Sequence, residues 1–234
     1  MVKIERQDTD KTRQAIQSLE REKLKTSGKY NTDKVFEALR EIFHEKCYIC
    51  ENKKATSWEV EHLKPHRGDV ELKFDWNNLF LSCAHCNHIK GSSYTPILDC
   101  TKVDVDELIS FRKIGYFGKD ESLSFERLTT VNDSKEISMT CRLLKRVYYG
   151  KTPTEKFGAK VLRNAVINQL SMFKNYVREY REASGEDKKD LFCQIQRELK
   201  SNSPFSAFKR WIIRDNPDWC KDFIDCWKMS PAFP

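Results

Sequence analysis

Residues 47–91 read CYICENKKATSWEVEHLKPHRGDVELKFDWNNLFLSCAHCNHIKG and contain two Cys-x-x-Cys pairs, Cys47/Cys50 and Cys83/Cys86. Four thiolates at about 2.3 Å satisfy the tetrahedral coordination that zinc prefers. A redox disulfide would need only one such pair, and neither pair opens a helix in a βαβ setting. We therefore predict a structural Zn²⁺ site whose four positions are all filled by sulfur, so that the metal holds the fold and does no chemistry.

The gap between Cys50 and Cys83 is longer than in the simplest zinc ribbon, so a folded insert must lie between the two pairs. WEVEH at 58–62 and NLFLSC at 78–83 are the expected strands, with a loop around Pro65 and Gly68 between them. A short polar helix should follow Cys83 and end near Gly91. All five histidines of the chain lie between positions 44 and 88, so the chemistry is expected in this region.

The order of motifs in the insert resembles the HNH, or ββα-metal, family of nucleases, in the subgroup with four cysteines. The resemblance covers residues 47–91 and rests on Glu61-His62, on the asparagine before Leu79, and on Cys-x-x-Cys-Asn-x-x-Lys. It implies that an acidic residue binds a divalent metal and that the next residue, a histidine, is the general base. It also implies an asparagine that orients the histidine and a second metal ligand after the last cysteine. These implied roles fall on Glu61, His62, Asn78 and Asn87.

Elementary chemistry agrees with those roles. Phosphodiester hydrolysis needs a deprotonated water and a cation that neutralises the charge building on the phosphate. A histidine with an unperturbed pKa near 6.5 can accept the proton, and oxygen ligands from Glu61 and Asn87 suit Mg²⁺ or Mn²⁺. Neighbouring residues on a regular strand point to opposite faces, so Glu61 and His62 can share a site only if the strand ends or twists at His62.

The chain departs from the usual family pattern at both expected metal ligands. Glu61 stands where aspartate or histidine is more usual, and Asn87 stands where many members have histidine. An all-oxygen site favours Mg²⁺, whereas the longer glutamate shifts the metal by about a methylene group, which leaves the metal preference open.

Two further residues are candidates for nucleic-acid contacts. His66 lies in the loop after the first strand and is predicted to contact a phosphate, although an ordinary surface histidine fits the pattern equally well. Lys90, near the end of the short helix, is predicted to touch the nucleic-acid backbone, with a solvated lysine as the alternative.

The rest of the chain is predicted to be mainly helical, giving an α+β fold with a small zinc-stapled ββα-metal core. Residues 11–30 carry little apolar surface and should form an exposed helical arm, before a helix capped by Asn31 or Thr32. A β-hairpin is expected at 107–128, with Gly115, Gly118 and Asp120 as turn formers. Thr152-Pro153-Thr154-Glu155 predicts a capping box, and further helix starts are expected at Ser203-Pro204 and Asn216-Pro217. The predicted units are an N-terminal helical arm at 1–45, the HNH core with its hairpin at 46–130, and a helical domain at 131–234.

Composition and charge limit the compartment and the partners. Hydrophobic residues make up 39% of the 234 residues, no apolar run approaches the length of a membrane span, and the charged opening MVKIERQDTDKTRQ does not resemble a signal peptide. We expect a protein of the reducing cytoplasm without a membrane partner. The net charge is +7, with −1 over residues 51–100 and +5 over 151–234, so a polyanion would be gripped largely outside the insert. The alternative is that the positive charge only keeps the protein surface soluble and binds no polyanion.

A narrower resemblance links the chain to the PtuB family of HNH nuclease subunits, found in Septu-type anti-phage systems and with some retrons. It rests on the opening MVKIER, on the core motifs and on SPFSAFKRWII at 203–213. The resemblance implies a nucleic-acid substrate, with DNA favoured and RNA possible, and an ABC-like ATPase partner of the PtuA kind, for which the helical half would be the docking surface. We therefore predict an HNH endonuclease that acts in phage defence. A zinc-stabilised nucleic-acid-binding module that does not cut, or a scaffolding subunit, are the alternatives.

Overall fold

The centre of the molecule is a two-stranded antiparallel sheet followed directly by a helix. The computed structural model describes residues 1–115 and 121–228. Strand β1 (Trp58–His62) pairs with β2 (Leu79–Cys83), with Glu61 opposite Phe80 and His62 opposite Leu79. Helix α4 (Ala84–Lys90) continues from β2 and ends at Gly91. The connection between the strands holds the short helix α3 (Val70–Phe74) and a turn of 3-10 helix, η1 (Trp76–Asn78). The predicted ββα core and the α+β class are confirmed.

The N-terminal segment forms a helical hairpin with one buried face and an exposed outer face. Helix α1 (Asp10–Lys23) packs against α2 (Asp33–Ile42), which begins after Thr32 as predicted. Thr12, Ala15 and Leu19 line the buried face of α1. The predicted helix is present and most of residues 11–30 are exposed, as expected, but the narrow buried face of α1 packs on α2, so the helix is not a free arm.

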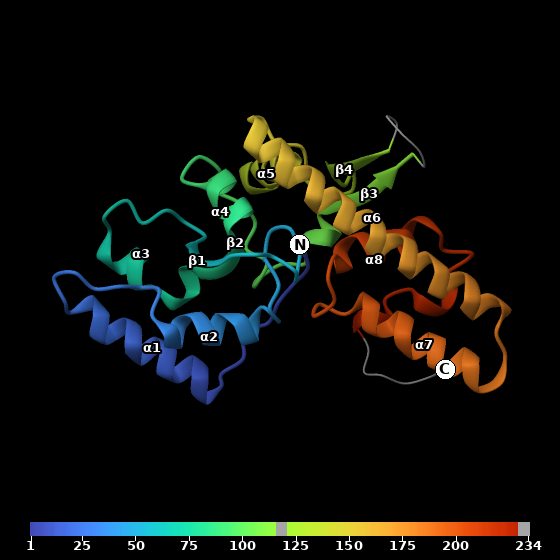
Figure 1. Ribbon diagram of the computed structural model, residues 1–234, viewed down its shortest axis with the longest axis horizontal. Helices are drawn as coiled ribbons and strands as arrows, with labels where there is room; N and C mark the ends of the chain where they lie inside the picture. Colours follow the sequence, from blue (N-terminus) through green and yellow to red (C-terminus); the bar gives the residue numbers. More distant parts are fainter. Residues whose placement is uncertain (116–120, 229–234) are drawn as a thin grey trace.

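The second half consists of a β-hairpin and four long helices, arranged on the other side of the central sheet from α1 and α2 (Figure 1). Strands β3 and β4 pair with Ile109 opposite Arg127; the predicted turn residues Gly118 and Asp120 lie outside the described residues. The helix predicted after Thr152 is present, and the Thr152 side chain accepts a hydrogen bond from the amide of Glu155. The elements are β3 (Ile109–Ile114), β4 (Ser122–Arg127), α5 (Lys135–Tyr149), α6 (Pro153–Glu182), α7 (Gly185–Leu199) and α8 (Ser206–Asp215).

Two predicted helix starts differ from the structure. Helix α8 begins at Ser206, after Phe205 in the left-handed region with φ 53°, so Ser203-Pro204 precedes the helix by a turn. After Asn216-Pro217 the chain makes only short 3-10 turns, η4 (Lys221–Phe223) and η5 (Cys226–Lys228).

The main hydrophobic core runs through all three predicted units. It contains residues of α1 and α2, the central sheet, the β3–β4 hairpin, α5, the first half of α6 and α8. A second, smaller core joins the end of α6 to α7 and the C-terminal turns. The division into units at 1–45, 46–130 and 131–234 stays a prediction. Within the described residues, no helix combines the length and apolar character needed to cross a membrane.

Candidate active site

Four cysteine sulfurs converge beside the central sheet. Cys47 and Cys50 lie in the turn after α2, Cys83 ends β2, and Cys86 lies on α4; all four are buried. Their sulfur atoms lie within 4.8 Å of one another, and those of Cys50 and Cys83 are 3.9 Å apart. A tetrahedron with zinc–sulfur bonds of about 2.3 Å has edges of about 3.8 Å. The donor set and its spacing fit a four-thiolate zinc site, as predicted.

His62 ends β1, and its ring is held by a backbone carbonyl. Its Nε2 lies 3.0 Å from the carbonyl oxygen of Lys73, in the short helix α3 between the two strands. A carbonyl only accepts hydrogen bonds, so Nε2 must carry the proton in the neutral ring, and Nδ1 keeps its lone pair. Burial lowers the pKa of His62 below its usual 6.5, which keeps the ring neutral at neutral pH. The side chain is therefore prepared to accept a proton through Nδ1.

Asn78 holds the loop that follows His62 rather than the ring itself. Its side chain accepts a hydrogen bond from the amide of Lys64 at 2.8 Å and donates to the carbonyls of Lys64 and Leu72 at 2.9 and 3.0 Å. The amide of Leu63 also donates to the Asn78 carbonyl at 2.9 Å. Asn78 thus ties the end of β1 to the segment that carries the Lys73 carbonyl, and its influence on His62 passes through the backbone.

The ring of His66 lies beside that of His62, with 4.8 Å between ring centroids. The amide of Gly68 donates to Nδ1 of His66 at 3.2 Å, so this nitrogen is an acceptor. Tyr30, from the loop between α1 and α2, packs edge-on against His62 at 4.4 Å and lies 6.5 Å from His66. The two histidines singled out from the sequence are therefore brought together, under an aromatic residue that sequence reasoning did not single out.

Glu61 and Lys90 form a buried ion pair, which changes the roles predicted for both. Glu61 is 5% exposed; one carboxylate oxygen contacts the ammonium of Lys90 and the other accepts a hydrogen bond from the hydroxyl of Tyr48. Burial raises the pKa of Glu61 to about 7, although Lys90 acts in the opposite direction. Lys90 is fully buried and also donates to the carbonyl of His62 at 2.8 Å. The prediction that Lys90 contacts the nucleic-acid backbone was wrong, since its ammonium is enclosed by protein.

Asn87 pairs with an acidic residue that was not predicted. Its amide nitrogen donates to the carboxylate of Glu59, two positions before Glu61 on β1. Both side chains are partly exposed, unlike Glu61. The two pairs follow from regular geometry, because Glu59 and Glu61 share a strand face while Asn87 and Lys90 share a helix face. Alternation along WEVEH was the signal that would have put Glu59 beside Glu61 as a candidate.

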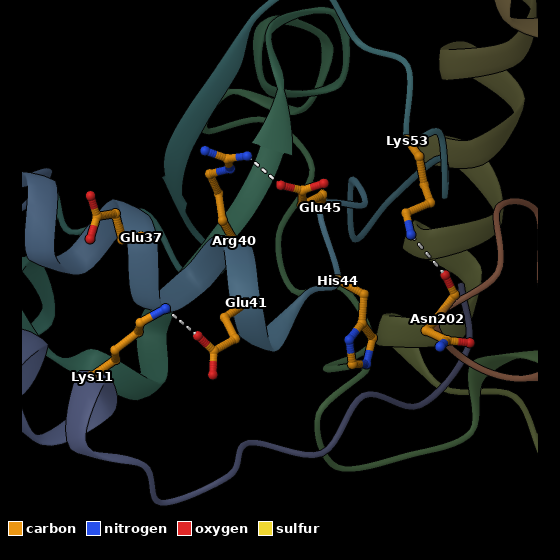
Figure 2. A pocket seen from close by; sticks show the side chains of 8 residues that line it. All are labelled: Lys11, Glu37, Arg40, Glu41, His44, Glu45, Lys53 and Asn202. Atoms are coloured by element: carbon orange, nitrogen blue, oxygen red, sulfur yellow. Dashed lines mark hydrogen bonds and ion pairs between the residues drawn. The ribbon is translucent and has the colours of Figure 1, made fainter.

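A separate charged hollow of 590 Å³ lies at the C-terminal end of α2 (Figure 2). Lys11 pairs there with Glu41 at 2.7 Å, and Lys53 donates to the carbonyl of Asn202 at 3.2 Å. Each of these two ammonium groups already has a partner in the protein, so neither is left unpaired to bind a phosphate. The other residues that line it are Glu37, Arg40, His44 and Glu45, with Arg40 paired to Glu45.

Comparison with known proteins agrees with the geometry of the four-cysteine core. Residues 47–93 match the family described as HNH endonuclease. Septu protein PtuB of Bacillus mycoides (strain KBAB4) is 32% identical over 83 residues, which are 29% of this chain and 28% of the relative. Septu protein PtuB of Bacillus thuringiensis is 28% identical over 193 residues, 79% of this chain and 70% of the relative. No solved structure gives a significant match. The chain therefore carries an HNH endonuclease domain, the domain of a phosphodiester-hydrolysing nuclease, at residues 47–93 and is homologous to Septu protein PtuB.

Proposed function

We propose that this chain is a divalent-metal-dependent endonuclease in which His62 is the general base. The observation that carries the proposal is the hydrogen bond between His62 Nε2 and the Lys73 carbonyl, which leaves Nδ1 as the proton acceptor. The lowered pKa of His62 supports the same role, because a neutral imidazole is needed to take a proton from water.

The surrounding residues have positioning roles in this mechanism. Asn78 and the Lys73 carbonyl fix the loop and the ring, so that the orientation of His62 is set before substrate arrives. Asn87 and an acidic residue of β1 hold Mg²⁺ or Mn²⁺, which neutralises charge on the phosphate when bound. His66, beside His62, hydrogen-bonds a phosphate oxygen. The four cysteines hold zinc and keep β2 and α4 in place beside β1.

The homology to Septu protein PtuB supports a role in phage defence. DNA is the favoured substrate, and an ATPase of the PtuA kind is the proposed partner. The helical half is the proposed docking surface, because it carries a large part of the chain's positive charge and lies across the molecule from α1 and α2 (Figure 1). Co-purification from the native host without any ATPase would contradict the partner.

The activity is tested with purified, zinc-loaded protein and supercoiled DNA or single-stranded RNA, in Mg²⁺ or Mn²⁺, with and without any ATPase that is encoded beside it. We expect cleavage by the wild type and a loss of at least about 100-fold for His62→Ala. His88→Ala is the matched control, since His88 is exposed on α4 and should cleave like the wild type. Equal cleavage by His62→Ala would remove the assigned base, and binding without cleavage under every condition would overturn the nuclease.

A further inference from the structure

The pair of metal ligands that the family resemblance implies does not fit this structure. A divalent cation needs oxygen ligands that face solvent and substrate. Both carboxylate oxygens of Glu61 are already occupied, by the ammonium of Lys90 and the hydroxyl of Tyr48. The Lys90 ammonium is itself a buried positive charge at this carboxylate, so a second cation would be repelled there.

Glu59 meets the requirements that Glu61 fails. It lies on the same face of β1, is partly exposed, and its carboxylate contacts the side chain of Asn87. In this structure the side-chain amide of Asn87 donates a hydrogen bond to Glu59 through its nitrogen. A 180° rotation of the amide group would instead place its oxygen beside the Glu59 carboxylate. A carboxylate oxygen and an amide oxygen would then adjoin, which is the hard ligand pair that Mg²⁺ and Mn²⁺ prefer.

The position of Tyr30 connects this pair with the proposed base. The Tyr30 ring packs against His62, and burial together with the nearby carboxylates of Glu59 and Glu61 raises its pKa. Tyr30 thus contacts the proposed base, and the carboxylates of β1 act electrostatically on the same side chain.

We propose that Glu59 and Asn87 hold the divalent cation of the nuclease, and that Glu61 is the buried structural partner of Lys90. This assignment rests on the proposed function only in that the cation is taken to serve phosphodiester cleavage. It moves the acidic ligand two residues along β1 from the position that the family resemblance implies.

The test is a titration of zinc-loaded protein with Mn²⁺, in which the electron paramagnetic resonance signal measures the concentration of the unbound ion. We expect Glu59→Gln, which preserves a hydrogen bond to Asn87, to weaken Mn²⁺ binding by at least about 10-fold. The double variant Glu61→Gln/Lys90→Met removes the buried pair together, so that no charge is left unpaired, and should bind Mn²⁺ within about threefold of the wild type. Glu71→Gln, at an exposed acid on α3, is the control for general surface charge.

Zinc content and far-UV circular dichroism establish that each variant is folded before binding is compared. Wild-type affinity in Glu59→Gln, loss of binding in the folded double variant, or no Mn²⁺ binding by the wild type would each overturn the assignment. The nuclease is judged separately by cleavage. If the wild type binds Mn²⁺ through Glu59 but cleaves nothing, the assigned ligands hold and the nuclease function is refuted. If the wild type cleaves but Glu59→Gln binds Mn²⁺ as tightly as the wild type, the nuclease function holds and the assigned ligands are refuted.

Discussion

One backbone carbonyl, that of Lys73, decides which nitrogen of His62 carries the proton. Two further features act on the same ring: partial burial disfavours its charged form, and Tyr30 restricts its rotation. None of these partners is visible in the sequence around His62, because Lys73 contributes a main-chain atom and Tyr30 lies on a distant loop. A motif can therefore propose a histidine as general base, whereas the tautomer of its ring depends on the folded chain around it.

Asn78 offers a direct measure of how much the loop matters. Asn78→Ala removes three buried hydrogen bonds to Lys64 and Leu72, each worth about 1 kcal/mol, and leaves backbone groups of the loop without partners. We expect the free energy of unfolding to fall by about 2–4 kcal/mol and DNA cleavage to fall with it. Chemical denaturation and a cleavage assay measure the two effects.

The neighbouring Asn77 provides the matched control for this prediction. Asn77 is exposed, so Asn77→Ala should change the free energy of unfolding by less than about 0.5 kcal/mol. If the two alanine variants proved equally stable and equally active, Asn78 would have no special role in holding the loop.

The burial of the Glu61–Lys90 ion pair could not be predicted from the sequence around either residue. Both side chains lie in polar runs, and a charged residue in such a run usually faces solvent. Tyr48, which lies between Cys47 and Cys50, donates a hydrogen bond to Glu61 in the folded structure, a contact that the sequence alone does not show. The neighbouring pair Glu59–Asn87 was missed for a different reason, since the motif directed attention to the acid next to the histidine.

At the scale of elements, the central sheet and its helix were predictable almost to the residue. Cysteine spacing, alternation along 58–62 and Gly91 all act locally, and each signal agrees with the others. The α1–α2 hairpin was not predictable in the same way, because α1 buries only a narrow face, Thr12, Ala15 and Leu19, in an otherwise polar helix. The consequence is functional, since the loop between these helices carries Tyr30 to the ring of His62.

Tyr30 therefore gives a prediction about this hairpin. Tyr30→Ala removes the ring that packs on His62, and we expect cleavage to fall by about 10- to 100-fold because the imidazole gains rotational freedom. Tyr30→Phe keeps the ring and should retain cleavage within about threefold of the wild type. Single-turnover cleavage rates distinguish the two variants. A loss in Tyr30→Phe equal to that in Tyr30→Ala would show that the hydroxyl, not the packing, is what matters.

The junction between α5 and α6 predicts a pH dependence of stability. The Arg146 side chain and the amide of Lys151 bond the carboxylate of Glu155, and the pKa of Glu155 is lowered from 4.5 to about 2. An acid with a lowered pKa stabilises the fold above its unfolded pKa, and this contribution is lost as the pH falls from about 4.5 to about 2. We expect Glu155→Gln to cost about 1 kcal/mol at pH 7, because solvent screens the partly exposed Arg146.

Denaturation of wild type and Glu155→Gln across pH 2–7 measures this contribution. The difference between the two proteins should shrink as the pH falls below about 4.5. The exposed Glu186→Gln, on α7, serves as the comparison and should follow the wild type at every pH. A constant difference between wild type and Glu155→Gln down to pH 2 would contradict the assignment.

Across the whole molecule, the zinc knuckle and the helical half are joined by buried polar contacts. Glu51, directly after Cys50, accepts a hydrogen bond from the amide of Ala207 at 3.0 Å. Lys46, directly before Cys47, donates to the carbonyl of Ser203 at 3.1 Å and to the hydroxyl of Ser206 at 3.2 Å. The late segment SPFSAFKRWII therefore contacts the residues that flank the first cysteine pair. The sequence could not predict this contact, because the two segments lie far apart along the chain.

This connection predicts that losing zinc will destabilise the helical half as well as the knuckle. Cys83→Ser removes one ligand, and because metal binding is folding energy, we expect a loss of several kcal/mol and a melting temperature lower by at least about 10 °C. The far-UV circular dichroism signal, which comes mainly from α5 to α8, should melt in a single transition at that lower temperature. Cys193→Ser, at a partly exposed thiol of α7, should keep its zinc and its melting temperature. Helices that still melted at the wild-type temperature in zinc-free Cys83→Ser would mean that the helical half folds independently of the knuckle, and the contacts of Glu51 and Lys46 would then be incidental to stability.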